Sequence, residues 1–140
     1  MTTREPAGDP VGDAQDDLTG ALVAELARRT GVCWIRVADR THPVWHAWSN
    51  GGLCVVGGGL EQPLPDLVDG DRVEILMRSK DTGGRLVIWV GRVSVVRAGD
   101  ELWEPTTAAL VARRNNLRDP VTVADDWARH SLVLRIQPTD

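Results

Sequence analysis

Alternation of apolar and polar residues predicts that the longest regular elements of this chain are two β-strands. Over 72–80, three apolar side chains alternate with charged ones, which is typical of a strand with one buried face. A second strand is predicted over 85–97, joined to the first by the turn residues 81–84. This second strand is apolar on both faces, so an outer helix or a second subunit should cover the face that does not point into the core. Asn50-Gly51, between two shorter apolar runs, predicts another hairpin.

Shorter apolar runs predict four further strands and two helices. The strands are expected at 32–37, 44–48, 53–56 and 131–137. A helix should follow a cap at Asp16 or Asp17, because leucines recur after it at four-residue spacing. A second helix is expected over 101–115, and a helical turn over 64–67. Six strands joined mainly by hairpins, with few helices, predict a small closed or nearly closed barrel.

The length of 140 residues fits one domain with a short tail. Residues 1–15 mix Thr, Pro, Gly and Asp with almost no apolar side chains, which predicts a disordered acidic tail, and 16–140 would form the single folded domain. Residues 1–17 hold five acidic side chains and one basic one, so 15 of the 20 acidic and 15 of the 16 basic residues follow them. The domain has no basic block that could follow a phosphate backbone, and we expect no nucleic-acid partner.

Composition also bears on where the protein resides. No apolar run reaches about 18 residues, so we expect no membrane-spanning segment. The N-terminus is acidic, where a signal peptide would be basic and then apolar. Cys33 and Cys54 lie in apolar runs and are interpreted as buried thiols rather than as a disulfide. These features predict a cytoplasmic protein.

Familiar catalytic and metal-binding motifs are missing from the sequence. Two distant cysteines and three histidines do not form a usual zinc set, so we expect no metal. His42 and His46 would share one face of a strand at a separation of roughly 13 Å, too far apart for a common metal ion. One of them could hydrogen-bond a ligand; the alternative is a polar residue on a half-exposed strand. We assign no catalytic residue.

The most suggestive binding chemistry surrounds the longer hairpin. Arg78, Ser79, Lys80 and Arg85 place three cations and a hydroxyl near its turn. They could hold a phosphate monoester through charge-assisted hydrogen bonds, or they could form a solvated hairpin tip. The run 57–59 consists of three glycines with no cation after it. That run is better suited to the close approach of a flat ligand than to a triphosphate.

Three segments of the chain carry a family resemblance. They are HPVWHAWSNGGLCVVGG (42–58), DRVEILMRSKDTGGRLVIWVGRVSVV (71–96) and WARHSLVLRIQP (127–138). In order and spacing they resemble the FMN-binding split-barrel family related to pyridoxamine 5'-phosphate oxidase, particularly its short actinobacterial members. The resemblance runs from about residue 18 to 138. It implies a fold that is mainly β (α+β): a six-stranded antiparallel split β-barrel with a few flanking helices.

The resemblance also implies a homodimer with FMN in each of two clefts between the subunits. The candidate cofactor-binding residues are Val44, Trp45, Val56, Gly57, Gln62, Arg78, Ser79, Lys80 and Arg85. By position, the backbone of the first four would lie along the isoalloxazine ring. Family members that hold FMN firmly usually carry Ser, Arg and Lys after the second hairpin strand, where this chain has Leu60-Glu61-Gln62-Pro63. The last four candidates would then have to anchor the phosphate.

The function implied is that of an FMN-binding oxidoreductase like pyridoxamine 5'-phosphate oxidase, acting on a small molecule that the sequence does not identify. Two alternatives stay open. One is a deazaflavin-dependent reductase of the same fold, and the other is a non-enzymatic dimer that binds a flavin, haem or nothing. Glu61, in the position of a cation, favours the two alternatives.

Overall fold

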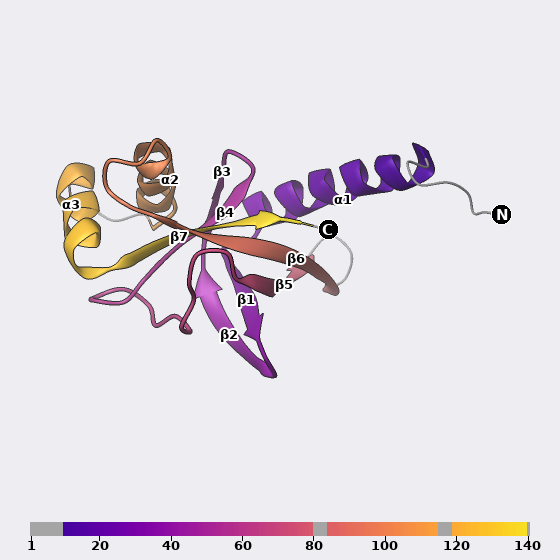
Figure 1. The fold of residues 1–140 in the computed structure, drawn as a ribbon, viewed down its shortest axis with the longest axis horizontal. Coiled ribbons are helices and arrows are strands. Elements are labelled where there is room, and N and C mark those ends of the chain that lie inside the picture. The colour runs from indigo at the N-terminus through magenta and orange to yellow at the C-terminus, as the bar shows by residue number, and fades with distance from the viewer. Residues whose placement is uncertain (1–9, 80–83, 115–118, 140) are drawn as a thin grey trace.

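Seven strands and three helices make up the part of the chain that the computed structural model describes, residues 10–79, 84–114 and 119–139 (Figure 1). In chain order they are α1 (Pro10–Arg29), β1 (Val32–Val37), β2 (Arg40–Trp45), β3 (Ala47–Ser49), β4 (Gly52–Gly57), β5 (Arg72–Ser79), β6 (Arg85–Val96), α2 (Trp103–Arg114), α3 (Pro120–His130) and β7 (Leu132–Pro138). None of the described helices is long and apolar enough to cross a membrane.

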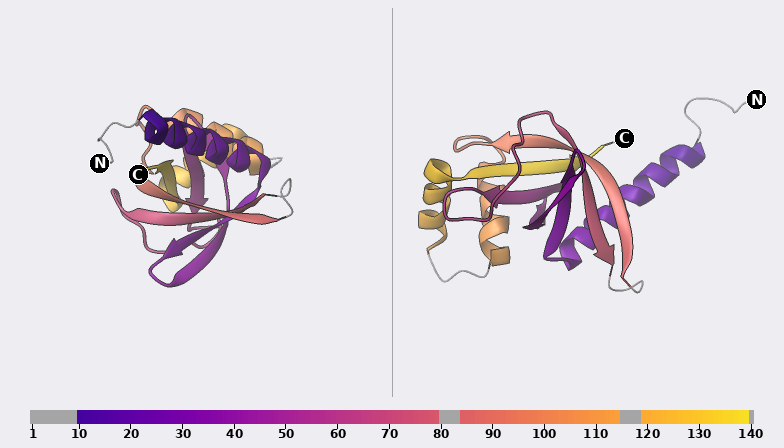
Figure 2. Two further views of the ribbon diagram at one scale, coloured as in Figure 1. Left: turned by 90° about the vertical axis from the view of Figure 1, so that its right-hand side faces the viewer. Right: turned by 90° about the horizontal axis from the view of Figure 1, so that it is seen from below.

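The strands form one antiparallel sheet with the order β2-β1-β5-β6-β7-β4-β3. Its two edge strands, β2 and β3, follow each other in the chain and are separated only by His46. The sheet therefore curls until its edges meet at this residue, as the two views in Figure 2 show. The predicted fold, a mainly β (α+β) antiparallel split barrel, is confirmed. It has seven strands rather than six, because the bend at His46 divides the strand expected over 44–48 between β2 and β3.

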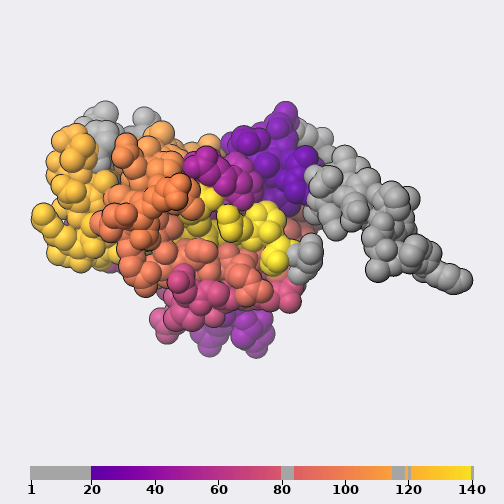
Figure 3. Space-filling view, turned by 45° about the horizontal axis from the view of Figure 1, so that its top comes forward, coloured from indigo at the N-terminus to yellow at the C-terminus, as the bar shows by residue number. Residues whose placement is uncertain are grey.

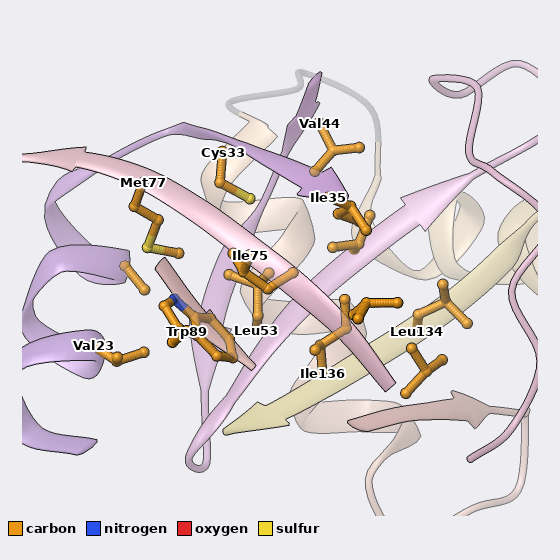
Figure 4. Close-up of a cluster of buried hydrophobic side chains, with 14 of the residues drawn as sticks. Val23, Cys33, Ile35, Val44, Leu53, Ile75, Met77, Trp89, Leu134 and Ile136 are labelled. Carbon is orange, nitrogen blue, oxygen red and sulfur yellow. The ribbon is translucent and has the colours of Figure 1, made fainter. Parts of the chain in front are cut away.

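The interior of the barrel is filled by apolar side chains from the inner faces of the strands (Figure 4). Ile35, Ile75 and Leu134 come from three different strands and are fully buried. Val23 of α1 lies beside Trp89 in this cluster, so α1 closes one end of the barrel. The helix is therefore held by the core through its apolar stripe.

A second, smaller core lies outside the barrel, where α2 and α3 cover β4 and β7. Leu110 of α2 and Val123 and Trp127 of α3 pack against Val56 and Val133 of the two strands. Figure 3 shows the β3–β4 hairpin (magenta) between α1 (indigo) and α2 (orange). These contacts hold α2 and α3 on the outer side of β4 and β7.

The helices differ from expectation at several points. α1 begins at Pro10, so residues 10–15 of the predicted disordered tail are helical, and residues 1–9 of that tail lie outside the described part of the chain. Proline suits a first helical turn because its missing N–H would have no partner there. The helical turn predicted over 64–67 is wrong. Leu64 precedes Pro65, and a residue before proline is disfavoured in the helical conformation.

α3 was not predicted at all. Asp119 caps it, because the side chain accepts a hydrogen bond from the backbone N–H of Val121, and Pro120 occupies the first turn. An Asp-Pro pair is a start signal for a helix, because Asp can cap the first turn and Pro suits its first position.

Candidate functional site

An apolar surface is exposed on the outer side of β1, β5 and β6. Trp34, Leu76 and Ile88 form one row across the three strands in the register of the sheet. Val32, Leu86 and Ile88 expose 49%, 42% and 46% of their surface. We call these five residues the open face. Apolar side chains that stay exposed together on one side of a sheet are typical of interaction surfaces.

Gln62, in the loop after β4, joins the two sides of the split in the barrel. Its carboxamide oxygen accepts a hydrogen bond from the N–H of Trp45 at 2.8 Å, and its nitrogen donates to the carbonyls of Trp45 and Val56, each at 3.0 Å. Trp45 ends β2 and Val56 belongs to β4, two strands that do not pair with each other. The Gln62 side chain thus bridges β2 and β4 by hydrogen bonds where the two strands do not pair. The backbone groups that it bonds are among those that the family resemblance places along the flavin ring.

The neighbouring residue, Glu61, has a buried carboxylate. Its side chain is only 8% exposed, accepts a hydrogen bond from the indole N–H of Trp127 at 2.9 Å and forms an ion pair with Arg114. Trp127 lies on α3 and Arg114 ends α2, so the carboxylate ties the loop to both helices. Sequence reasoning noted that Glu61 replaces a cation but missed these partners, which lie far away in the chain.

The glycine run in this loop is explained by contacts within the chain. A Cβ added at Gly57 would lie 2.2 Å from Cγ of Leu64, and one added at Gly59 would lie 2.6 Å from the carbonyl oxygen of His130. Gly59 also has a φ of +61°, which favours glycine. The space that seemed suited to a flat ligand is thus filled by Leu64 and by the last turn of α3.

A pocket of about 570 Å³ opens between this loop and α3. It is lined by Gly59, Leu60, Glu61, Asp126, Trp127, His130 and Ser131. Two carboxylates contribute to its wall, and the carbonyl end of α3, which carries partial negative charge, points toward the loop. The same wall also carries the indole of Trp127, the imidazole of His130 and the hydroxyl of Ser131.

The cations of the longer hairpin do not share one face. Arg78 pairs with Leu86 in the register of β5 and β6, whereas Arg85 pairs with Ser79. Paired residues point to the same side and successive residues to opposite sides, so Arg78 belongs to the side of the open face and Arg85 to the other. The guanidinium of Arg78 donates to the carbonyl of Gly84 at 2.9 Å. Lys80 lies outside the described residues.

Of the two histidines considered as ligand donors, His46 is fully buried where the sheet edges meet. Its Nε2 lies 3.0 Å from the carbonyl oxygen of Ala27, which can only accept, so Nε2 carries the proton in this arrangement. Burial, and secondarily the nearby Arg113, lower the pKa of His46 from 6.5 to about 4. His42 is half-buried and pairs with the inward-facing Ile35. His46 therefore docks α1 on the barrel instead of facing a ligand.

Both cysteines are buried thiols, as predicted. Burial raises the pKa of Cys33 to about 12, and burial also raises the pKa of Cys54 although Arg135 opposes it. Arg135 is itself buried, and its guanidinium donates to the carbonyls of Ser49 and Asn50, each at 2.8 Å. Arg135 therefore stabilises the β3–β4 turn by hydrogen bonds, and its buried guanidinium does not face a ligand site.

The structure thus brings together only part of the predicted cofactor site. The side chain of Gln62 hydrogen-bonds to the backbone of both Trp45 and Val56, and Gly57 follows Val56 at the end of β4. Val44 is buried inside the barrel, so only its backbone could meet a ligand. The end of β5 and the start of β6 lie on the opposite side of the molecule from the loop after β4 (Figures 1 and 2).

Two solved structures share this architecture. HutZ, the heme storage protein from Vibrio cholerae, matches with a TM-score of 0.59 and 16% identity over 86% of this chain and 89% of that chain. Rv2991, a conserved hypothetical protein from Mycobacterium tuberculosis, matches with a TM-score of 0.58 and 15% identity over 86% of this chain and 80% of that chain. No family model and no curated protein matches the sequence. At this identity the likeness shows the fold alone: the chain shares with both structures the architecture of an antiparallel split barrel.

Proposed function

We propose that two copies of this chain pair through the open face and hold a flavin between them, as a flavin-dependent oxidoreductase of the split-barrel fold. The observation that carries the proposal is the open face itself, an apolar strip of sheet with a cation, Arg78, beside Leu86 at its border. Such a strip suits a planar aromatic ring, and a cation at its border suits an anionic group on that ring's side chain.

Pairing of two copies is favoured by the apolar area that one chain leaves in water. Val32, Leu86 and Ile88 are each close to half exposed. Full burial of such a side chain is worth roughly 1.5–3 kcal/mol, so covering the exposed half of each contributes about 1 kcal/mol per residue in each copy. A two-fold axis doubles every contact, and two-fold dimers are the commonest closed assemblies.

FMN is the form of flavin that the family resemblance implies, and deazaflavin is the alternative. The residues of the loop after β4 do not fit the phosphate of either, because Glu61 holds a buried carboxylate where family members carry cations. The side of the hairpin that carries Arg78 offers the better place for an anionic group. The proposal therefore rests on contacts between the flavin ring and the open face, and not on binding of the phosphate by the loop after β4.

A haem-binding carrier is the second candidate, and a specific observation favours it. Haem is planar and carries carboxylates but no phosphate, so it would not need the cations that this loop lacks. The similarity to HutZ, a heme storage protein, lends this candidate support at the level of the fold. In that case the dimer would carry its cofactor without catalysing a reaction.

Titrations with riboflavin and with hemin test the proposal. We expect riboflavin fluorescence to be quenched by the wild-type protein and not by Ile88→Glu, which places a charge on the open face. Val121→Glu is the matched control, because Val121 is an exposed apolar residue on α3, away from the open face. Binding of hemin without binding of any flavin would instead identify the second candidate. If Ile88→Glu binds riboflavin as tightly as the wild-type protein, the open face is not the site.

A further inference from the structure

A hollow lies between the ends of α1 and α2, with β3 as its floor; Figure 3 shows these elements beside one another. Its volume is about 370 Å³, within the range of small-molecule pockets. Four alanines, the indole of Trp48 and the side chains of Arg28 and Arg113 line it. No residue of the open face is among them, so the hollow is separate from the site of the proposed function.

The two arginines of this hollow carry charge that no carboxylate balances. Each of the two helices ends in two adjacent arginines, and the second of each pair, Arg29 and Arg114, forms an ion pair with a glutamate. Arg28 and Arg113 form no ion pair within the described part of the chain. The last turn of a helix favours cations in general, so arginines there do not by themselves indicate a ligand. Arg28 and Arg113, however, border one and the same hollow.

The guanidinium of Arg113 is held in place by the end of α1. It donates hydrogen bonds to the carbonyls of Arg28 and Thr30, and it packs against Gly31, where a Cβ would lie 3.3 Å from Nη2. A guanidinium has five N–H donors, so these two bonds leave others for a ligand. The side chain of Arg28 is exposed and makes no hydrogen bond to another described residue. One fixed cation and one free cation thus flank the hollow.

The apolar part of the hollow is open because its side chains are small. Ala109 and Ala112 stand three residues apart on α2 and Arg113 follows, so the three share one face of the helix. Trp48 supplies the only aromatic surface of the lining, and an edge-to-face contact with Trp89, at 6.4 Å between ring centroids, orients its indole. The hollow therefore combines a flat apolar wall with two cations at its border.

We propose that this hollow binds a small aromatic carboxylate, with its ring against Trp48 and the alanines and its carboxylate between Arg28 and Arg113. The fork of a guanidinium matches the two oxygens of a carboxylate with parallel, charge-assisted hydrogen bonds. A phosphate has further oxygens that need donors, and the alanines of the wall have none to offer. The ring of an aromatic acid, by contrast, is satisfied by apolar contact.

Equilibrium dialysis of the wild-type protein against 2-naphthoate at low ionic strength tests the proposal. We expect one naphthoate to bind per chain, and Arg28→Ala to weaken this binding roughly tenfold or more, because it removes a charge-assisted hydrogen bond. Arg129→Ala is the matched control, since it removes an exposed arginine from the last turn of α3 and should leave the affinity unchanged. 2-Naphthalenemethanol, which has the same ring without the charge, should bind weakly and to the same extent to the wild-type protein and to Arg28→Ala.

A second pair of variants tests the apolar wall. Ala112 is exposed, so Ala112→Leu fills the hollow without crowding the core, and we expect it to lose binding of naphthoate. Ala108→Leu is its control, because Ala108 is an exposed residue of α2 that does not line the hollow. Urea midpoints close to that of the wild-type protein establish that the variants fold.

Three results would overturn the proposal. The first is that the wild-type protein binds no naphthoate at millimolar concentration. The second is that Arg28→Ala or Ala112→Leu binds it as tightly as the wild-type protein does. The third is that inorganic phosphate at an equal concentration displaces it, because the site would then recognise charge alone. None of these results bears on the open face or on flavin binding.

Discussion

His46 should make the folded protein lose stability as the pH falls. Its imidazole is fully buried and donates a hydrogen bond through Nε2 to the carbonyl of Ala27, while Nδ1 has no partner among the described residues. Protonation would add a second buried donor without an acceptor, close to the guanidinium of Arg113. This is why the pKa of His46 is lowered from 6.5 to about 4, with burial as the main cause, although the bond to Ala27 opposes the shift.

The sign and size of the effect follow from linkage between protonation and folding. Between the two pKa values the unfolded chain holds a proton on His46 and the folded chain does not. The free energy of unfolding therefore has its full value above pH 6.5, decreases as the pH falls through that value and levels off below about pH 4. One pKa unit corresponds to about 1.4 kcal/mol, so the whole loss should be roughly 3 kcal/mol.

Urea denaturation across this pH range measures the effect. His46→Gln keeps an N–H that can reach the carbonyl of Ala27 and removes the titration, so we expect its free energy of unfolding to fall less steeply with pH than that of the wild-type protein. His130→Gln removes an exposed imidazole and should keep the wild-type dependence. If the wild-type protein and His46→Gln show parallel curves, the assigned role of His46 is refuted.

Three further predictions concern the loop, the β3–β4 turn and the longer hairpin. Gly59→Ala should destabilise the fold by several kcal/mol more than Gly70→Ala in thermal denaturation. Both glycines have a positive φ, but only at residue 59 would the added Cβ lie 2.6 Å from a backbone carbonyl oxygen. Arg135→Lys should cost on the order of 1.5–3 kcal/mol in urea, since lysine cannot bond both turn carbonyls in the same fork; an unchanged midpoint would contradict the role given to this arginine. Arg85→Ala should leave flavin affinity unchanged, because Arg85 points away from the open face, and a clear loss would place it in the site.

Much of the sheet could be predicted from sequence because its signals are local. Asn50 and Gly51 have φ angles of +51° and +75°, the conformation that a tight hairpin turn requires and that Asn-Gly favours. The bend at His46 could not be predicted in this way. At His46 the chain passes from β2, which pairs with β1, to β3, which pairs with β4. The alternation of apolar and polar residues does not indicate where a strand changes its pairing partner.

The candidate site was harder to predict because it depends on register and on distant contacts. A turn over 81–84 would pair Lys80 with Arg85 and place the cations on one face, whereas the structure pairs Ser79 with Arg85. A difference of one residue in register moves a side chain to the other face of a strand. The hydrogen bond between Glu61 and Trp127 joins residues that are far apart in the chain, and no local sequence pattern predicts it.

The central claim, that two copies hold a flavin between them, is tested most directly by sedimentation velocity of the wild-type protein with riboflavin, followed at a wavelength where only the flavin absorbs. We predict that the flavin sediments with a species of twice the mass of one chain, at one flavin per chain. Flavin that remains with the solvent while the protein sediments, or that sediments with a single chain, would contradict the claim.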